Sequence, residues 1–137
     1  DVYACLLDKY QKMIKDLLDE GIQGCTSRQE KERAGIKCFV KFALQNPNIY
    51  KVIWGSLSID EKMFHDYYTS FAKSYAYSLK KNEDDVLSTD YITLSYFLMG
   101  ISNFLGLRAI FENMTDEQID EMIDSTVMPA LSKGILK

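Results

Sequence analysis

Apolar residues recur at intervals of three and four along most of the chain, and no stretch alternates strictly between apolar and polar positions. A period near 3.6 residues is typical of amphipathic helices, whereas half-buried strands alternate with a period of two. The first helical pattern covers Val2–Gly21, and Gly21 and Gly24 favour the left-handed conformation that closes a helix. The whole pattern predicts an all-α fold, with six helices in an antiparallel, bundle-like array forming a single domain over residues 1–137.

Three capping-box motifs mark predicted helix starts. In such a motif, a Ser or Thr side chain accepts from the backbone N–H three residues later, and a Glu or Gln at that later position accepts from the backbone N–H of the Ser or Thr. These motifs are Ser27-x-x-Glu30, Ser58-x-x-Glu61 and Thr115-x-x-Gln118. Pro47 suits the first position of a short third helix, which Gly55 should close. Pro129 should kink the last helix late, because proline lacks the backbone N–H that a helix interior uses.

The longest uncharged stretch is residues 91–107, inside a helical pattern that extends from about Asp90 to Glu112. Seventeen residues fall short of the roughly 20 that cross a bilayer, and the serines, the asparagine and the two glycines make a poor membrane span. We therefore expect a central helix of a globular domain, capped by Ser88 or Thr89 and buried on nearly every side.

This central helix sorts its side chains by size onto two faces, counting about 100° per residue. The large side chains Phe97, Ile101 and Phe104 lie opposite a stripe of small ones. Small side chains let another helix approach closely, so we expect the stripe and the last helix to form a dimer interface. The predicted interface residues are Ser95, Ser102, Gly106, Ala109, Met122, Thr126 and Ala130. The alternative is that the stripe packs only within the monomer.

Charge and cysteine content narrow the function. The formal net charge is −4 and no run of lysines and arginines stands out, which argues against nucleic-acid binding by this chain alone. Cys5, Cys25 and Cys38 are odd in number and widely spaced, so they form no disulfide framework. A reduced, cytoplasmic setting is the expectation. The chain starts inside a helical pattern at Asp1, as a fragment without its N-terminal part would.

The sequence offers no pattern for catalysis or metal binding. His65 is the only histidine, and Glu61 four residues before it suits an exposed helical pair. A zinc site built from the three cysteines and His65 would lack the usual short ligand spacings. Phosphate loops and nucleophile elbows are also missing. We therefore expect no enzyme, no cofactor and no metal.

The chain has nine tyrosines and seven phenylalanines, many of them in the predicted fourth and fifth helices. They either fill the core or line an apolar cavity in which Tyr, Ser and Thr hydroxyls orient a ligand. The predicted cavity residues are Trp54, Phe64, Tyr68, Phe71, Phe97, Ile101 and Phe104. Arg108 could meet an anionic group of the ligand, or it could face water and offset the helix dipole.

Four segments together resemble the C-terminal domain of TetR-type transcriptional regulators. They are FVKFALQNPNIYKVIWG, FHDYYTSFAKSYAYSLKK, TLSYFLMGISNFLGLRAIF and MTDEQIDEMIDSTVMPALSKGI, and the resemblance covers essentially the whole chain. The six predicted helices would correspond to the fourth to ninth of that family. The helix-turn-helix domain formed by the family's first three helices is missing, so no DNA-contacting residue can be assigned.

The resemblance implies a function as well as a fold. The last two helices would pair with their mates in a two-fold homodimer, and the earlier helices would enclose a cavity for a small apolar or amphipathic effector. Residues 1–21 would join this domain to the DNA-binding domain, so DNA would be a partner only through that missing domain, and a membrane would not be one. The alternative, from another class, is a helical adaptor that binds a protein through an exposed apolar groove.

Overall fold

The computed structural model describes residues 2–137, and every regular element among them is helical, which confirms the predicted all-α class. The elements are α1 (Val2–Gly21), α2 (Arg28–Gln45), α3 (Pro47–Ile59), α4 (Glu61–Lys81), the 3-10 turn η1 (Glu83–Asp85), α5 (Tyr91–Glu112), α6 (Asp116–Met122), the π-helical turn η2 (Ile123–Val127) and α7 (Met128–Lys133). Because α6, η2 and α7 follow one another without a break, residues 116–133 form one long helix. The described chain thus has six main helices, as predicted.

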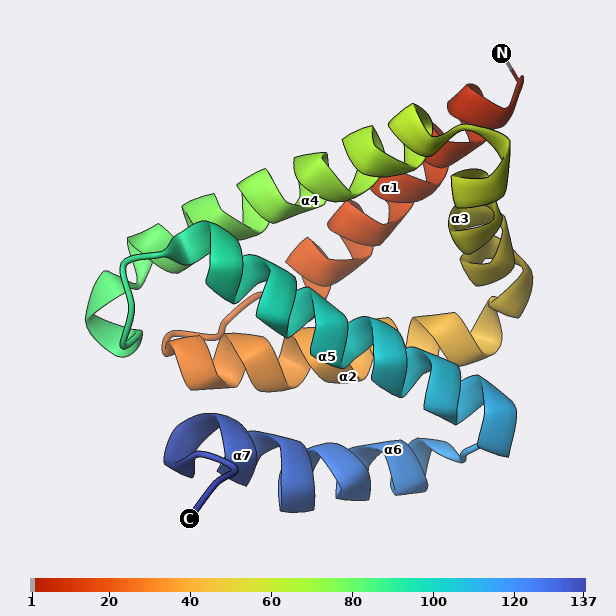
Figure 1. The fold of residues 1–137 in the computed structure, drawn as a ribbon. Helices are drawn as coiled ribbons and strands as arrows, with labels where there is room; N and C mark the ends of the chain where they lie inside the picture. Colours follow the sequence, from red (N-terminus) through yellow and green to blue (C-terminus); the bar gives the residue numbers. More distant parts are fainter. Residues whose placement is uncertain (1) are drawn as a thin grey trace.

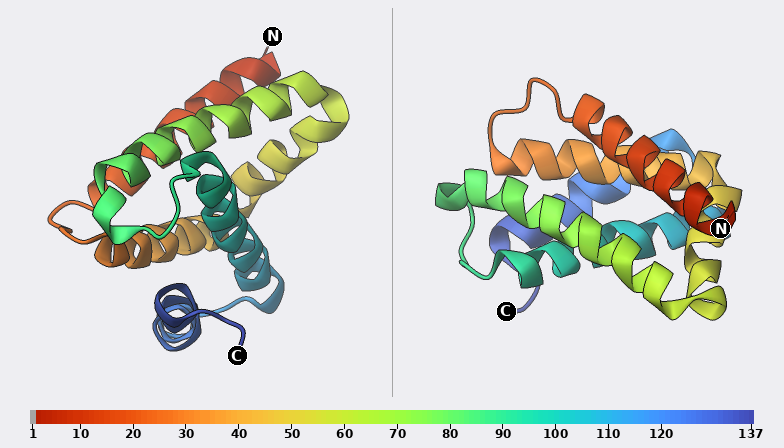
Figure 2. Two further views of the ribbon diagram at one scale, coloured as in Figure 1. Left: turned by 60° about the vertical axis from the view of Figure 1, so that its left-hand side comes forward. Right: turned by 90° about the horizontal axis from the view of Figure 1, so that it is seen from above.

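Helix α2 lies at the centre of the molecule. In Figure 1, α1 and α4 run side by side above α2, α5 crosses it, and the α6–α7 helix lies below it. Two further views show the same order of layers (Figure 2). Val40 and Ala43 of α2 are completely buried. The prediction that α5 is buried on nearly every side is wrong, because its Phe97, Phe104 and Phe111 are exposed, and α2 is the helix at the centre.

Two apolar cores flank α2. One lies where α2 meets α5 and the α6–α7 helix, and its buried members are Ile36, Val40, Ala109, Met114, Ile119, Ile123 and Val127. The other joins α1, α3 and α4, and its buried members are Leu7, Ile14, Ile53 and Tyr67. The core beside the α6–α7 helix is therefore separate from the core that holds the aromatic side chains of α3 and α4.

Helix α2 is central although its sequence is polar, because it meets the α6–α7 helix through charged as well as apolar side chains. Arg33 Nε lies 2.7 Å from Asp124 Oδ1, and Lys37 Nζ lies 2.9 Å from Asp124 Oδ2. One turn along, Lys41 Nζ lies 2.9 Å from Asp120 Oδ1. These ion pairs fix the position of the last helix on α2.

Two of the three predicted capping residues, Thr115 and Ser27, cap helices as expected. Thr115 and Gln118 form a complete capping box, with the Gln118 N–H donating to Thr115 Oγ1 and the Thr115 N–H donating to Gln118 Oε1. Ser27 caps α2 by accepting from the Glu30 N–H at 3.1 Å. Its return bond is displaced by one residue, because the Glu30 carboxylate accepts from the Thr26 N–H.

The boundary between α3 and α4 differs from the prediction. Helix α3 begins at Pro47 as expected, but it continues through Gly55 and takes in Ser58. Asp60 caps α4 instead, accepting from the Met63 N–H at 3.2 Å. A helical glycine is tolerated at a modest cost, so Gly55 need not end a helix, and the aspartate is an equally good capping residue.

The start of α5 and the surroundings of Pro129 also differ from the prediction. Asp90 caps α5 by accepting from the Thr93 N–H at 3.0 Å, in place of Ser88 or Thr89. In the last helix, Pro129 is accommodated by the π-helical turn that precedes it, in which the Met128 N–H donates to the carbonyl five residues back. The wider turn lies directly before Pro129, which has no backbone N–H to donate to the helix.

Candidate functional site

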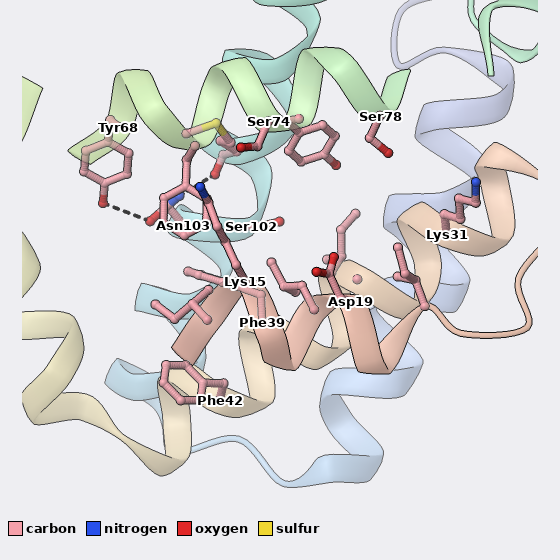
Figure 3. Close-up of a pocket in the computed structure, with 18 of the residues that line it drawn as sticks. Lys15, Asp19, Lys31, Phe39, Phe42, Tyr68, Ser74, Ser78, Ser102 and Asn103 are labelled. Carbon is pink, nitrogen blue, oxygen red and sulfur yellow. Dashed lines mark hydrogen bonds between the residues drawn. The ribbon is translucent and has the colours of Figure 1, made fainter. Parts of the chain in front are cut away.

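A cavity of about 180 Å³ lies among helices α1 to α5 (Figure 3). Its apolar walls are formed by Ile14, Leu18, Ile22, Ile36, Phe39, Phe42, Ile49, Ile53, Phe71 and Met99. An apolar cavity of about 150 Å³ holds benzene, and drug-sized ligands occupy about 300–1,000 Å³. The cavity therefore has room for a small molecule of about one ring with a short side chain.

Tyrosine hydroxyls and Asn103 gather at one end of the cavity. The Asn103 amide donates to the Met99 carbonyl at 2.7 Å, which leaves Asn103 Oδ1 to accept from the Tyr68 hydroxyl at 3.4 Å. Tyr50 donates to the Asn103 carbonyl. Burial raises the pKa of Tyr50 to about 12, and it raises the pKa values of Tyr67 and Tyr68 as well. These hydroxyls stay neutral at physiological pH and can only donate or accept hydrogen bonds.

A buried ion pair closes the other end of the cavity. Arg28 and Glu32 are 8% and 6% exposed, and the Arg28 Nη2 and Nε atoms lie 2.7 and 2.9 Å from Glu32 Oε1. Arg28 Nη1 donates to Ser78 Oγ at 2.8 Å, and the Tyr75 hydroxyl donates to the other Glu32 oxygen. Burial and the Glu32 carboxylate hold the Tyr75 pKa well above its usual value. The Arg28 charge is thus neutralised within the protein.

Lys15, Asp19, Lys31 and Ser74 also line the cavity (Figure 3), and because each is at least partly exposed, they mark its polar mouth. Lys31 Nζ donates to Asn82 Oδ1 at 3.0 Å, whereas Lys15 Nζ has only Ser70 Oγ, at 3.5 Å. Within residues 2–137, neither ammonium group has a carboxylate oxygen within 4.0 Å. The mouth therefore carries two cations without an ion-pair partner in the described chain.

Two of the predicted cavity residues, Tyr68 and Phe71, line the cavity. Trp54 and Phe64 lie behind Tyr68, with ring centroids 5.9 Å apart, and Phe64 is 4.8 Å from Tyr68. These two rings support the cavity wall without forming part of its surface.

The other predicted cavity residues lie elsewhere. Ile101 packs in the core between α2 and the last helix, while Phe97 and Phe104 are 54% and 66% exposed. Arg108 is also exposed and pairs with Glu112, its Nε lying 2.7 Å from Glu112 Oε2. The expectation that all these side chains converge on one interior region is wrong. Helix α5 turns its small side chains inward, and its phenylalanines Phe97 and Phe104 face outward.

The predicted dimer stripe is therefore an internal contact. Ser95 and Ala109 are fully buried, and Gly106 packs directly against Ala43 of α2. Ser102 lines the cavity. The assignment of this stripe to a dimer interface is wrong, and the alternative, that it packs within the monomer, holds.

The predicted interface residues of the last helix are at least partly exposed, unlike most of the stripe on α5. Met122 packs partly into the core beside α2, and its sulfur accepts from Arg108 Nη1 at 3.4 Å. Thr126 is exposed, and Ala130 is half-buried. Met122 and Thr126 line a shallow surface groove together with Arg108, so the outer faces of α5 and the last helix meet there.

All the predicted cavity residues belong to α3, α4 and α5, so the part of the wall contributed by α1 and α2 was missed. Lys15 and Asp19 of α1, and Phe39 of α2, all line it. The polar part of the cavity wall on α4 did have a signal in the sequence. Ser70, Ser74 and Ser78 recur every four residues and form a polar edge along α4, beside its aromatic face.

The outward face of α5 carries three exposed phenylalanines. Phe97, Phe104 and Phe111 are exposed and spaced by seven residues, with Gly100 and Leu107 between them at steps of three and four. This spacing is that of a helix–helix seam. A Cβ atom added to Gly100 would meet nothing within 4 Å, so the backbone at the middle of the seam is open to a partner.

The described residues provide few other sites. Residues 2–137 contain no group of three or more His, Cys, Asp and Glu side chains that could hold a metal ion. By length and composition α5 could cross a membrane, although its inner face packs against α2 and α4. In comparisons with known proteins, neither a family model nor a curated protein matches this sequence. The case for a function therefore depends on the cavity and the open face of α5.

Proposed function

We propose that this chain is the effector-binding and dimerisation domain of a TetR-like transcriptional repressor of the cytoplasm. The observation that carries the proposal is the cavity, which is apolar, of ligand size, and lined by five helices. Protein interiors are normally packed with few voids larger than a water molecule. A void of this size with a polar mouth is the usual form of a small-molecule site.

The cavity also touches the helix that would transmit the signal. Ile14, Lys15 and Leu18 of α1 line it, so a bound effector contacts α1 directly. Polar contacts also join α1 to its neighbours, because Tyr3 donates to the Val52 carbonyl and Gln11 Nε2 donates to the Tyr67 carbonyl at 3.0 Å. In the proposed mechanism, effector binding shifts α1 against α4. This shift changes the spacing of two DNA-binding domains that lie outside this chain.

The proposed homodimer uses the open face of α5 and not the small stripe. Phe97, Phe104 and Phe111 would pack against the same face of a second copy, and Gly100 would let the two helices approach closely. The adjoining groove of Arg108 and Met122 would bring the last helix into the interface. Burying three phenylalanines in this way provides the apolar centre that a stable interface needs.

A helical adaptor for another protein remains the second candidate, because the same face of α5 could receive a foreign helix. The two candidates differ in oligomeric state. Sedimentation velocity of the full chain at micromolar concentrations should give a dimer if the repressor proposal is correct. A monomer that also binds no small molecule would favour the adaptor.

The repressor proposal is tested by thermal unfolding in the presence of a panel of small apolar and amphipathic compounds. A compound at 100 times its Kd stabilises the folded state by about 2.7 kcal/mol, which raises Tm by several degrees. Ser102→Phe, which places a ring in the cavity, should abolish the rise. Ser58→Phe on the exposed side of α3 is the matched control and should retain it. A panel without any stabilising compound, or equal shifts in both variants, would contradict the proposal.

A further inference from the structure

Lys15 of α1 lines the cavity and reaches Ser70 and Phe71 of α4 (Figure 3). Its ammonium lies 3.5 Å from Ser70 Oγ, a long hydrogen bond, and 5.4 Å from the centre of the Phe71 ring. An ammonium group has three N–H donors. In the described structure, one of them is weakly used and none meets a carboxylate, so the group can donate to a ligand oxygen without breaking a strong bond.

The other two cations around the cavity are poorer candidates for this role. Arg28 is held by Glu32 on two sides and by Ser78 on a third, so an anion there would have to displace a buried ion pair. Lys31 makes a good hydrogen bond, 3.0 Å to Asn82, at the α2 end of the mouth. Lys15 is therefore the cation that is both adjacent to the apolar wall and least engaged.

Charge around the mouth sets the sign of the ligand. The whole chain has a formal net charge of −4, yet Lys15 and Lys31 outnumber Asp19 at the rim. A single negative charge is attracted by the two ammonium groups, while Asp19 would oppose a second one. Ser74, one turn beyond Ser70 on α4, adds a hydroxyl donor beside the path of the anion.

We infer that the cavity takes a small monocarboxylate with an apolar body, and that Lys15 binds its carboxylate. The apolar body lies between Phe39, Phe71 and Met99, and the serine edge of α4 supplies further donors to the carboxylate. This inference rests on the proposed function, because it assumes that the cavity is a ligand site. It goes further by naming the ligand class and the residue that selects it.

The test compares 3-phenylpropanoate with its neutral analogue 3-phenylpropanamide, by titration calorimetry on the full chain at pH 7. The two probes share their ring and length and differ in charge. A charge-assisted hydrogen bond contributes enough for a difference of about ten-fold or more in Kd. We expect the acid to bind at least about ten-fold more tightly than the amide. Lys15→Gln should remove this preference and leave the affinity for the amide within about two-fold.

Two matched variants locate the charge. Lys12→Gln removes a lysine from the exposed side of the same helix and should leave the preference for the acid intact. Lys31→Gln should weaken it by less than Lys15→Gln does. Loss of the preference in Lys31→Gln but not in Lys15→Gln would overturn the assignment to Lys15. Equal binding of acid and amide would overturn the ligand class and leave the cavity as a site.

Failure of both probes to bind would also contradict this inference. It would not by itself contradict the proposed function, because the panel of compounds in the thermal-unfolding experiment tests the cavity without regard to charge. Circular dichroism of each variant must show the helical content of the wild type, so that a lost preference reports on Lys15 and not on unfolding.

Discussion

A Cβ atom added to Gly106 of α5 would lie 3.2 Å from the Cβ atom of Ala43 in α2. Gly106→Leu should therefore overpack the interior of the monomer and lower the free energy of unfolding by about 1–3 kcal/mol, as measured by urea denaturation. Ser58→Leu on α3 is the control, because Ser58 is exposed and lies outside the proposed dimer face. Equal destabilisation by the two substitutions would contradict the packing of α5 on α2.

The open face of α5 should control self-association. Phe104→Ser removes the middle ring of the seam, and the dimer dissociation constant should rise by at least about 30-fold if Phe104 is a central interface residue. Sedimentation velocity measures the change. Tyr77→Ser on α4 is a matched control, because Tyr77 and Phe104 are 65% and 66% exposed. A dimer that survives Phe104→Ser, or is lost equally in Tyr77→Ser, would rule out this face.

The buried ion pair should be sensitive to the loss of one partner. Glu32→Gln leaves the Arg28 charge buried without its carboxylate, and we expect a loss of about 3–5 kcal/mol in urea unfolding. Glu112→Gln breaks an exposed pair with Arg108 and should have no measurable effect. The double variant Arg28→Met, Glu32→Gln should recover part of the loss. A Glu32→Gln protein as stable as the wild type would show that the pair does not hold α2 and α4 together.

Acid should weaken the contact between α2 and the last helix. Hydrogen bonds from Arg33 and then Lys37 lower the pKa of Asp124 to about 2, below its usual 3.8. A depressed folded-state pKa contributes stability that is complete above about pH 4 and is lost as the pH falls toward 2. Asp124→Asn should remove this part of the acid dependence and cost about 0.5–1 kcal/mol at pH 7, because the side chain is partly exposed.

The control for this pH dependence is Asp66→Asn. Hydrogen bonds from Lys62 and His65 also lower the pKa of Asp66, but they join neighbours within α4 and connect no two helices. Because these pairs are exposed, solvent screening leaves little of their stabilisation, so Asp66→Asn should keep most of the acid dependence of the wild type from pH 7 to pH 2. If Asp124→Asn also follows the wild type over this range, the ion pairs between α2 and the last helix contribute nothing to stability.

Local features of the fold could be predicted from the sequence because they depend on neighbouring residues. Helical periodicity gave the all-α class and six helices, and the capping box of Thr115 and Gln118 is present as expected. Asp60 and Asp90 took the capping roles assigned to nearby serines, since several residues in a row could cap equally well. Ambiguity of this kind moves a boundary by a few residues and leaves the element intact.

The placement of helices could not be predicted in the same way. The size sorting of α5 was recognised, but a single helix does not reveal which face meets its own chain and which meets a partner. Helix α2 was not recognised as central, because its Arg33, Lys37 and Lys41 pair with Asp120 and Asp124, about 80 to 90 residues away in the sequence. Such distant pairing leaves no local signal, so the central helix and half of the cavity wall were missed.

Contacts between a bound ligand and the protein test the central claim most directly. Isotope-filtered nuclear Overhauser spectra of the labelled full chain would be recorded with a compound that raises its Tm. The account predicts contacts from the ligand to the side chains of Phe39, Tyr68 and Met99 in the cavity. Contacts confined to Phe97, Phe104 and Phe111 on the open face of α5 would contradict it.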